Sequence, residues 1–124
     1  MAQEFTDAAK NLMLDALDAG ANAVWLSAHT ATPGLTGANE VSGGTPAYAR
    51  IEATYAAASG GSKALSASVT LDIPASTTVA FVGAWTAVTA GTFLGQVDTT
   101  DEVFGSQGTL EITTATLALD QDPA

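Results

Sequence analysis

The sequence predicts a mainly β fold, an antiparallel β-sandwich of jelly-roll-like type or a small barrel, with one helix at the N-terminus. Apolar residues recur with a helical period only in the first segment and with a period of two afterwards. Turn residues separate the alternating segments, and 124 residues without a linker or repeat fit one domain, 1–124. The predicted elements are a helix at 6–19 and strands at 22–29, 47–57, 64–73, 77–87, 92–97 and 109–119.

The helix has suitable residues at both ends. Thr6 or Asp7 can cap its N-terminus, and Gly20 can follow its last turn in a left-handed conformation. Its apolar stripe consists of Ala9, Leu12, Met13, Ala16 and Leu17. We expect this stripe to pack on the core, with Asp15 and Asp18 lying off it. The alternative is an amphipathic helix that binds a partner protein.

Strict alternation marks the strands. The first strand places Val24, Leu26 and Ala28 on one face. The third strand has the clearest pattern, and its apolar positions are Leu65, Ala67, Val69, Leu71 and Ile73. The fourth strand is apolar on both faces, which indicates a central place in its sheet. Between strands we expect a long loop at 30–46 and a polar loop at 98–108, and long loops often carry function.

Charge limits the classes of partner. Three basic residues, Lys10, Arg50 and Lys63, face thirteen acidic ones, so the formal net charge is -10. Without a basic cluster we expect no binding to nucleic acid or to an anionic membrane. The sequence lacks cysteine, a signal-peptide pattern and an uninterrupted apolar run of spanning length, so we expect a protein made in a cytoplasm, without a transmembrane segment.

Few residues offer chemistry. His29 is the single histidine, and the chain lacks a nucleophile-elbow motif, so we expect His29 to bond to loop backbone and the protein not to be an enzyme. Asp98, Asp101 and Glu102 lack the spacing of a calcium loop, and a solvated acidic loop is the better interpretation. We expect no metal and no cofactor. A carbohydrate-binding module is another hypothesis, resting on the aromatic residues Trp25, Trp85, Tyr48 and Tyr55.

One extended motif resembles a known family. The run from Trp25 to Gly34, the run from Thr36 to Gly44, and Tyr48-Ala49-Arg50 are similar to segments of small virion proteins of tailed bacteriophages. The chain departs from that pattern in its Trp25–Ala28 run and in an inserted Thr45-Pro46-Ala47. Members of this family are described as minor tail, tail-fibre or head-decoration components. The resemblance spans the chain and implies a structural, non-enzymatic role.

Within a virion, the expectation is an exterior capsid decoration protein that binds the major capsid protein. The alternative is a minor tail or tail-fibre protein, with host-carbohydrate contact as an option. Partners would be the major capsid protein or other virion subunits and further copies of the chain, for which a trimer is plausible. The predicted interface residues are Phe5, Thr32, Pro33, Asn39, Glu40, Val41, Tyr48, Arg50, Asp101 and Phe104.

Overall fold

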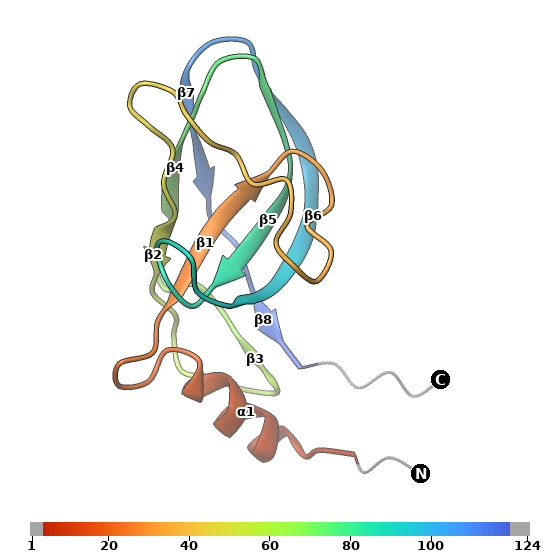
Figure 1. Cartoon of the computed structure of the whole chain (residues 1–124). Coiled ribbons are helices and arrows are strands. Elements are labelled where there is room, and N and C mark those ends of the chain that lie inside the picture. The colour runs from red at the N-terminus through yellow and green to blue at the C-terminus, as the bar shows by residue number, and fades with distance from the viewer. Residues whose placement is uncertain (1–3, 120–124) are drawn as a thin grey trace.

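A computed structural model describes residues 4–119 and shows one helix and eight strands (Figure 1). The elements in chain order are α1 (Asp7–Ala16), β1 (Val24–His29), β2 (Ile51–Ala53), β3 (Ser62–Lys63), β4 (Val69–Ile73), β5 (Thr77–Trp85), β6 (Phe93–Phe104), β7 (Gly108–Ile112) and β8 (Leu117–Ala118). The predicted mainly β fold with one N-terminal helix is confirmed.

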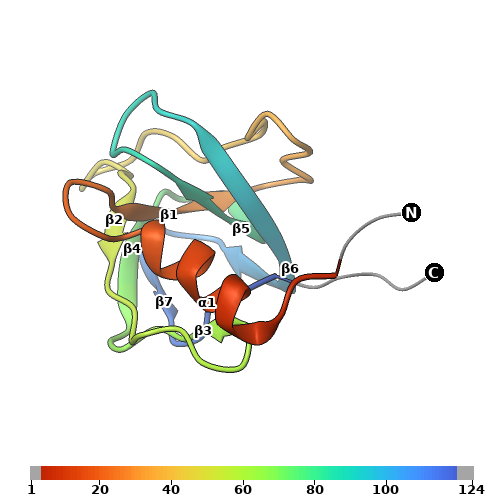
Figure 2. The ribbon, with the colours of Figure 1, turned by 90° about the horizontal axis from the view of Figure 1, so that it is seen from below.

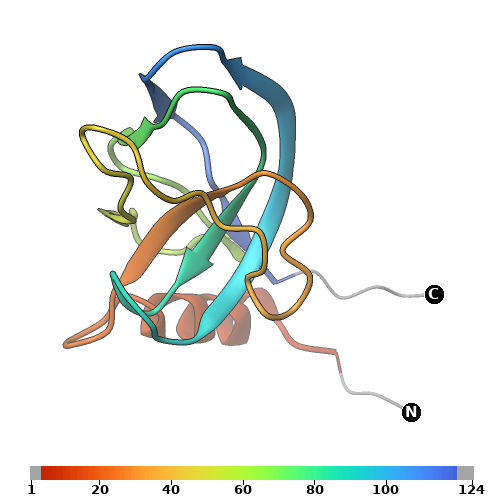
Figure 3. The ribbon, with the colours of Figure 1, turned by 45° about the horizontal axis from the view of Figure 1, so that its top comes forward.

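The strands form one larger and two smaller antiparallel sheets. The larger sheet has the order β2-β1-β5-β6, while β4 pairs with β7 and β3 with β8. A short turn at 74–76 joins β4 to β5, and 105–107 join β6 to β7. The hairpin of β5 and β6 therefore bends over at its far end and continues as the β4–β7 pair, which Figure 3 shows in profile. The result is an open sandwich in which one ribbon contributes to both layers.

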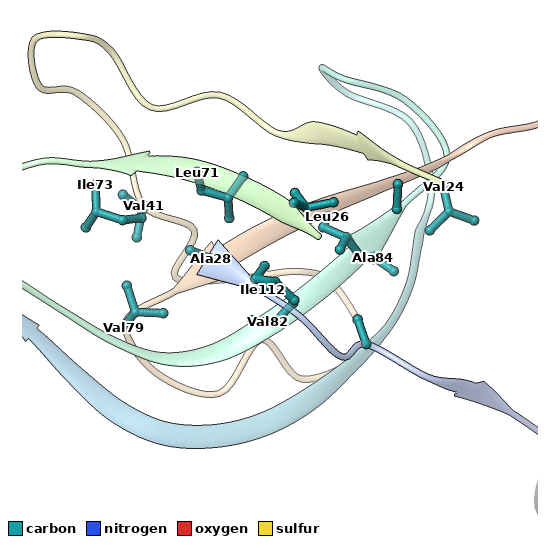
Figure 4. Close-up of a cluster of buried hydrophobic side chains, with 13 residues drawn as sticks. Val24, Leu26, Ala28, Val41, Leu71, Ile73, Val79, Val82, Ala84 and Ile112 are labelled. Carbon is teal, nitrogen blue, oxygen red and sulfur yellow. The ribbon is translucent and has the colours of Figure 1, made fainter. Parts of the chain in front are cut away.

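The core lies between the larger sheet and the β4–β7 pair. Figure 4 shows Leu26 and Ala28 from β1, Leu71 from β4, Val82 from β5 and Ile112 from β7 pointing into one cluster. Burial of each large aliphatic side chain contributes about 1.5–3 kcal/mol. The predicted inward faces of the first and third strands are thus confirmed where the strands form, and β5 is central as predicted.

Several predicted strand boundaries are wrong. The predicted strand at 47–57 is only three residues long in β2, and the strand at 64–73 begins at Val69, with Leu65 in an isolated bridge to Tyr55. The segment 109–119 is divided into β7 and β8, and β3 was not predicted. The largest error is the polar loop at 98–108, because β6 continues through it to Phe104. As an edge strand, β6 is exposed on both faces over this stretch. Its apolar and polar residues therefore do not alternate, and the sequence pattern does not indicate a strand there.

The helix begins where the sequence predicts, but the face that it buries is not the predicted apolar stripe. Thr6 caps it, its hydroxyl accepting a hydrogen bond from the Ala9 amide at 3.2 Å. The helix ends at Ala16, so Gly20 lies in a following turn and not directly after the last helical residue. Figure 2 shows α1 lying across one end of the sandwich beside β3. The only fully buried residue of α1 is Leu14, which is not in the predicted stripe.

Candidate interaction surfaces

The segment 30–46 first covers the outer face of the larger sheet and then follows the edge of β1, where Val41 joins the core. The Thr30 amide donates to the Asn39 carbonyl and the Val41 amide to the Ala28 carbonyl, each at 3.0 Å. At its tip, the Pro33 carbonyl accepts from the amides of Gly37 and Ala38, at 3.1 and 3.0 Å. The first part of the segment, up to Ala38, therefore forms an additional layer over β1 and β5 (Figure 1).

His29 is buried under this layer. Its Nδ1 lies 2.8 Å from the Ala38 carbonyl, which can only accept, so Nδ1 carries the proton. Nε2 then accepts from the Ser27 hydroxyl at 2.7 Å, and the Ser27 oxygen accepts from the Trp85 indole at 3.0 Å. Burial lowers the pKa of His29, which favours the neutral ring this arrangement needs. The predicted bond from His29 to loop backbone is confirmed, and the Ser27 hydroxyl is enclosed away from any substrate.

Arg50 organises a second internal network. Its guanidinium binds both carboxylate oxygens of Glu40 at 2.9 Å and donates to the carbonyls of Ala87 and Ala90 at 3.0 and 2.9 Å. Its Cζ atom lies 3.6 Å from the centroid of the Trp85 ring, within the range of a cation–π contact.

Tyr48 completes the Arg50 network from the other side of Glu40. The Tyr48 hydroxyl donates to Glu40 at 2.8 Å and accepts from the Ala28 amide at 3.0 Å. Burial alone would raise the pKa of Glu40, but the hydrogen bonds from Arg50 and Tyr48 outweigh it and lower that pKa. Glu40 therefore stays ionised next to Arg50, and the network binds the segment 30–50 to the sheet.

Two glycines allow these networks to close. Gly37 has a φ of +78°, and a β-carbon there would overlap the six-membered ring of Trp85. A β-carbon on Gly83 would lie 2.6 Å from the Ser27 hydroxyl and 2.7 Å from His29 Nε2. The motif shared with phage proteins therefore encodes a packed internal contact between a loop and a sheet.

This packing shows where the predicted interface residues lie. Pro33, Val41 and Arg50 are buried, and Glu40 and Tyr48 are turned inward, so within the single chain these five make internal contacts. The remaining predicted residues lie elsewhere: Thr32 and Asn39 are exposed on the loop, Asp101 is exposed on β6, Phe104 is half-buried at the end of β6, and Phe5 is exposed before α1. Whether they contact a partner stays a prediction.

The aromatic residues proposed for sugar stacking are also engaged internally. Trp85 is buried under Gly37 and Arg50, and Trp25 is half-buried. Tyr48 binds Glu40, and the Tyr55 hydroxyl donates to the Ala115 carbonyl at 2.9 Å. These contacts leave the carbohydrate hypothesis without an exposed aromatic platform among the four residues on which it rested.

Polar contacts attach α1 to the body. Lys63 of β3 is only 3% exposed, and its ammonium group binds Asp18 and, at 3.2 Å, Asp15. Asp15 also accepts from the Ala58 amide, and Asn11 accepts from the Gly61 amide, both at 2.9 Å. Burial alone would lower the pKa of Lys63, but the hydrogen bonds to Asp18 and Asp15 outweigh it and raise that pKa. The helix thus turns its polar side toward the sandwich.

The apolar side of α1 consequently faces outward. Leu12 is 75% exposed, and Met13 and Ala16 are exposed beside it, which we call the outward stripe. Phe5, just before the helix, is exposed as well. The prediction that the whole apolar stripe packs on the core is wrong, because only Leu17 at its end packs against the core cluster, and the buried residue of the helix, Leu14, lies outside the stripe. The alternative of a partner-binding helix fits this orientation.

A second exposed apolar region lies along β6. A groove of about 360 Å³ runs between the first half of β6 and the segment leading into β8, with the helix at its end. Leu94 and Val97 from β6, Leu117 and Leu119 from the last segment, and Leu14 and Leu17 from the helix region line it. No pattern in the sequence indicates this groove, because it forms where two segments distant in the chain meet.

Among residues 4–119, the carboxylates and His29 form no group of three or more that could bind a metal ion. Asp98, Asp101 and Glu102 are spread along β6 instead of meeting in a loop. Within the same residues, no helix combines the length and hydrophobicity needed to cross a membrane.

Comparison with known proteins identifies the family. No curated protein and no solved structure matches the chain significantly. A family model described as Podophage GP4 fiber I protein gp80 matches residues 4–120, which is nearly the whole chain. This match confirms the resemblance to phage virion proteins that the motif indicated. The chain belongs to the Podophage GP4 fiber I protein gp80 family, a family of phage structural proteins.

Proposed function

We propose that the chain is a non-enzymatic subunit of a phage fibre and that the outward stripe of α1 anchors it to a neighbouring virion subunit. The family description names a fibre, and this supports the tail-fibre reading over the capsid decoration protein that the sequence favoured. The side chains with the most reactive chemistry, His29 and Ser27, are enclosed and hydrogen-bonded, which also fits a structural role.

The observation that carries the proposal is the reversed orientation of α1. An amphipathic helix on a globular domain normally buries its apolar face. Here Lys63 and three polar residues, Asn11 and Asp15 of the helix and Asp18 just after it, hold the opposite face against the body. Exposed apolar side chains on a firmly attached helix are typical of a protein–protein contact, because burial in an interface removes them from water.

The first experiment locates the protein in the particle. Gold labelling of a tagged chain in purified virions, together with quantitative mass spectrometry, should place it on fibres at the low copy number of a tail appendage. Label distributed over the capsid at a copy number matching the capsid lattice would refute the fibre placement and restore the decoration hypothesis.

The second experiment tests the anchor. Leu12→Asp should leave the isolated protein folded, since a surface substitution changes stability by no more than about 0.5 kcal/mol, and should prevent its incorporation into particles. Leu35→Asp is the matched control, because Leu35 is 94% exposed but lies on the loop tip far from α1 in sequence. Incorporation of both variants at the same level would contradict the anchoring role of α1.

A further inference from the structure

The sandwich is incomplete on the side of β6. The larger sheet has four strands and the layer opposite has the β4–β7 pair, so the two layers differ in width. β6 is the outermost strand and runs for 12 residues, and among the described residues only β5 pairs with it. Its other edge presents backbone donors and acceptors to solvent, which is a template for a further strand.

The inner face of β6 is uncovered near the groove. Gly95 and Val97 stand opposite Ala84 and Val82, both of which are buried in the core. Val97 is nevertheless 49% exposed, and a β-carbon built on Gly95 would meet nothing within 4 Å. The first half of β6 therefore borders apolar space that a side chain from another segment can fill.

The second half of β6 is acidic. Asp98, Asp101 and Glu102 are all exposed on this strand. The basic residues of the chain lie elsewhere: Arg50 and Lys63 are buried in ion pairs, and Lys10 packs by Gly61 at the helix. Antiparallel pairing of β6 with β6 of a second copy would bring these carboxylates together without a cation, which is unfavourable.

We propose that β6 binds an extended segment of another virion protein as an added strand. The segment carries apolar side chains opposite residues 94–97, where they enter the groove, and lysine or arginine opposite residues 98–102. Backbone hydrogen bonds along the edge supply affinity, and the two side-chain classes fix the register. The identity of the partner as a virion protein rests on the proposed function, whereas its chemistry rests on β6 alone.

The test begins with peptides that tile the virion proteins of the phage encoding this chain. The purified full chain should select peptides that combine apolar and basic residues, and these should slow amide hydrogen exchange at residues 94–102. Binding should weaken as salt rises, because exposed charges are screened. Selection of acidic peptides, of no peptide, or of peptides that leave exchange in β6 unchanged would overturn the proposal.

Matched charge reversals complete the test. The double variant Asp101→Lys/Glu102→Lys should bind the selected peptide at least about tenfold more weakly. The control variant Glu52→Lys/Glu111→Lys makes the same change in net charge on other strands and should retain binding. Equal weakening by both pairs would reduce the effect to overall charge and overturn the proposal. Sedimentation gives a second outcome that would overturn the proposal. If the wild-type chain is a dimer and the Asp101→Lys/Glu102→Lys variant is a monomer, the segment bound at β6 is a second copy of this chain. Labelling of particles is independent of these readouts, so failure of the fibre placement and failure of the β6 site are distinguishable.

Discussion

Replacing Arg50 by alanine tests the network that fixes the segment 30–50 to the sheet. Arg50 is 8% exposed and its partner Glu40 is 22% exposed, so the ion pair is largely withdrawn from water. The substitution would leave the Glu40 carboxylate without its cation and the carbonyls of Ala87 and Ala90 without their donor. It would also remove the contact with the Trp85 ring.

The expected loss of stability follows from these contacts. Removing one partner of a buried ion pair costs about 3–5 kcal/mol, and the partial exposure of Glu40 places the effect of Arg50→Ala near 4 kcal/mol. For a chain of this size, 1 kcal/mol corresponds to a shift in Tm of roughly 4 °C, so the Tm should fall by about 15 °C. Arg50→Lys keeps the charge but not the two-pronged geometry, and it should cost about half as much.

Urea denaturation of a double-mutant cycle is the appropriate assay. Glu40→Gln alone leaves Arg50 as a buried cation and should be destabilising. The double variant Arg50→Ala/Glu40→Gln should be more stable than the sum of the two single losses predicts, by at least about 1 kcal/mol. The reason is that each single variant leaves the other charged side chain without its partner. Additive losses, agreeing within about 0.5 kcal/mol, would show that Arg50 and Glu40 act independently and would refute this reasoning.

Three further predictions concern the loop layer and the helix attachment. Gly37→Ala should destabilise the fold by about 1–3 kcal/mol more than Gly34→Ala in urea titrations, because both glycines have positive φ but only Gly37 lies against the Trp85 ring; equal losses would argue against that contact. Since burial lowers the pKa of His29, the unfolded state binds more protons below pH 6.5, the ordinary His29 value, and the free energy of unfolding should fall there by up to about 1.4 kcal/mol per pH unit. This slope should vanish in His29→Gln, and its persistence would assign it to another group. Lys63→Met should leave two carboxylates facing each other and accelerate hydrogen exchange of the α1 amides while the core amides remain protected; unchanged exchange in α1 would contradict the role of Lys63 in attachment.

The sequence predicts the buried strands well, because a strand with one buried face has apolar and polar residues in alternation. Val69, Leu71 and Ile73 alternate with polar residues, and their inward face is the one observed. The same logic fails at Asp98–Glu102, where an edge strand exposes both faces and resembles a loop. It also fails for α1, since amphipathicity shows which face could be buried but not that Lys63, distant in sequence, would attract the polar face.

The interface residues show a different limit of sequence reasoning. The phage-like motif contains Glu40, Tyr48 and Arg50, which the sequence predicts as interface residues. A motif does not say whether its residues contact a partner or one another, and here they contact one another. One signal was available: a chain with only three basic residues has few partners for its acids, which favours internal use of Arg50.

The tight turn at the tip of the loop layer also offers a practical handle. Pro33 accepts hydrogen bonds from Gly37 and Ala38, so the two ends of the tip are held together while Leu35 between them points into solvent. Foreign peptide inserted beside Leu35 would leave from a closed, anchored base, and exposed tips of this kind are the places where chains accept insertions. The fold therefore offers a display position for epitopes or affinity tags that lies apart in sequence from both α1 and β6.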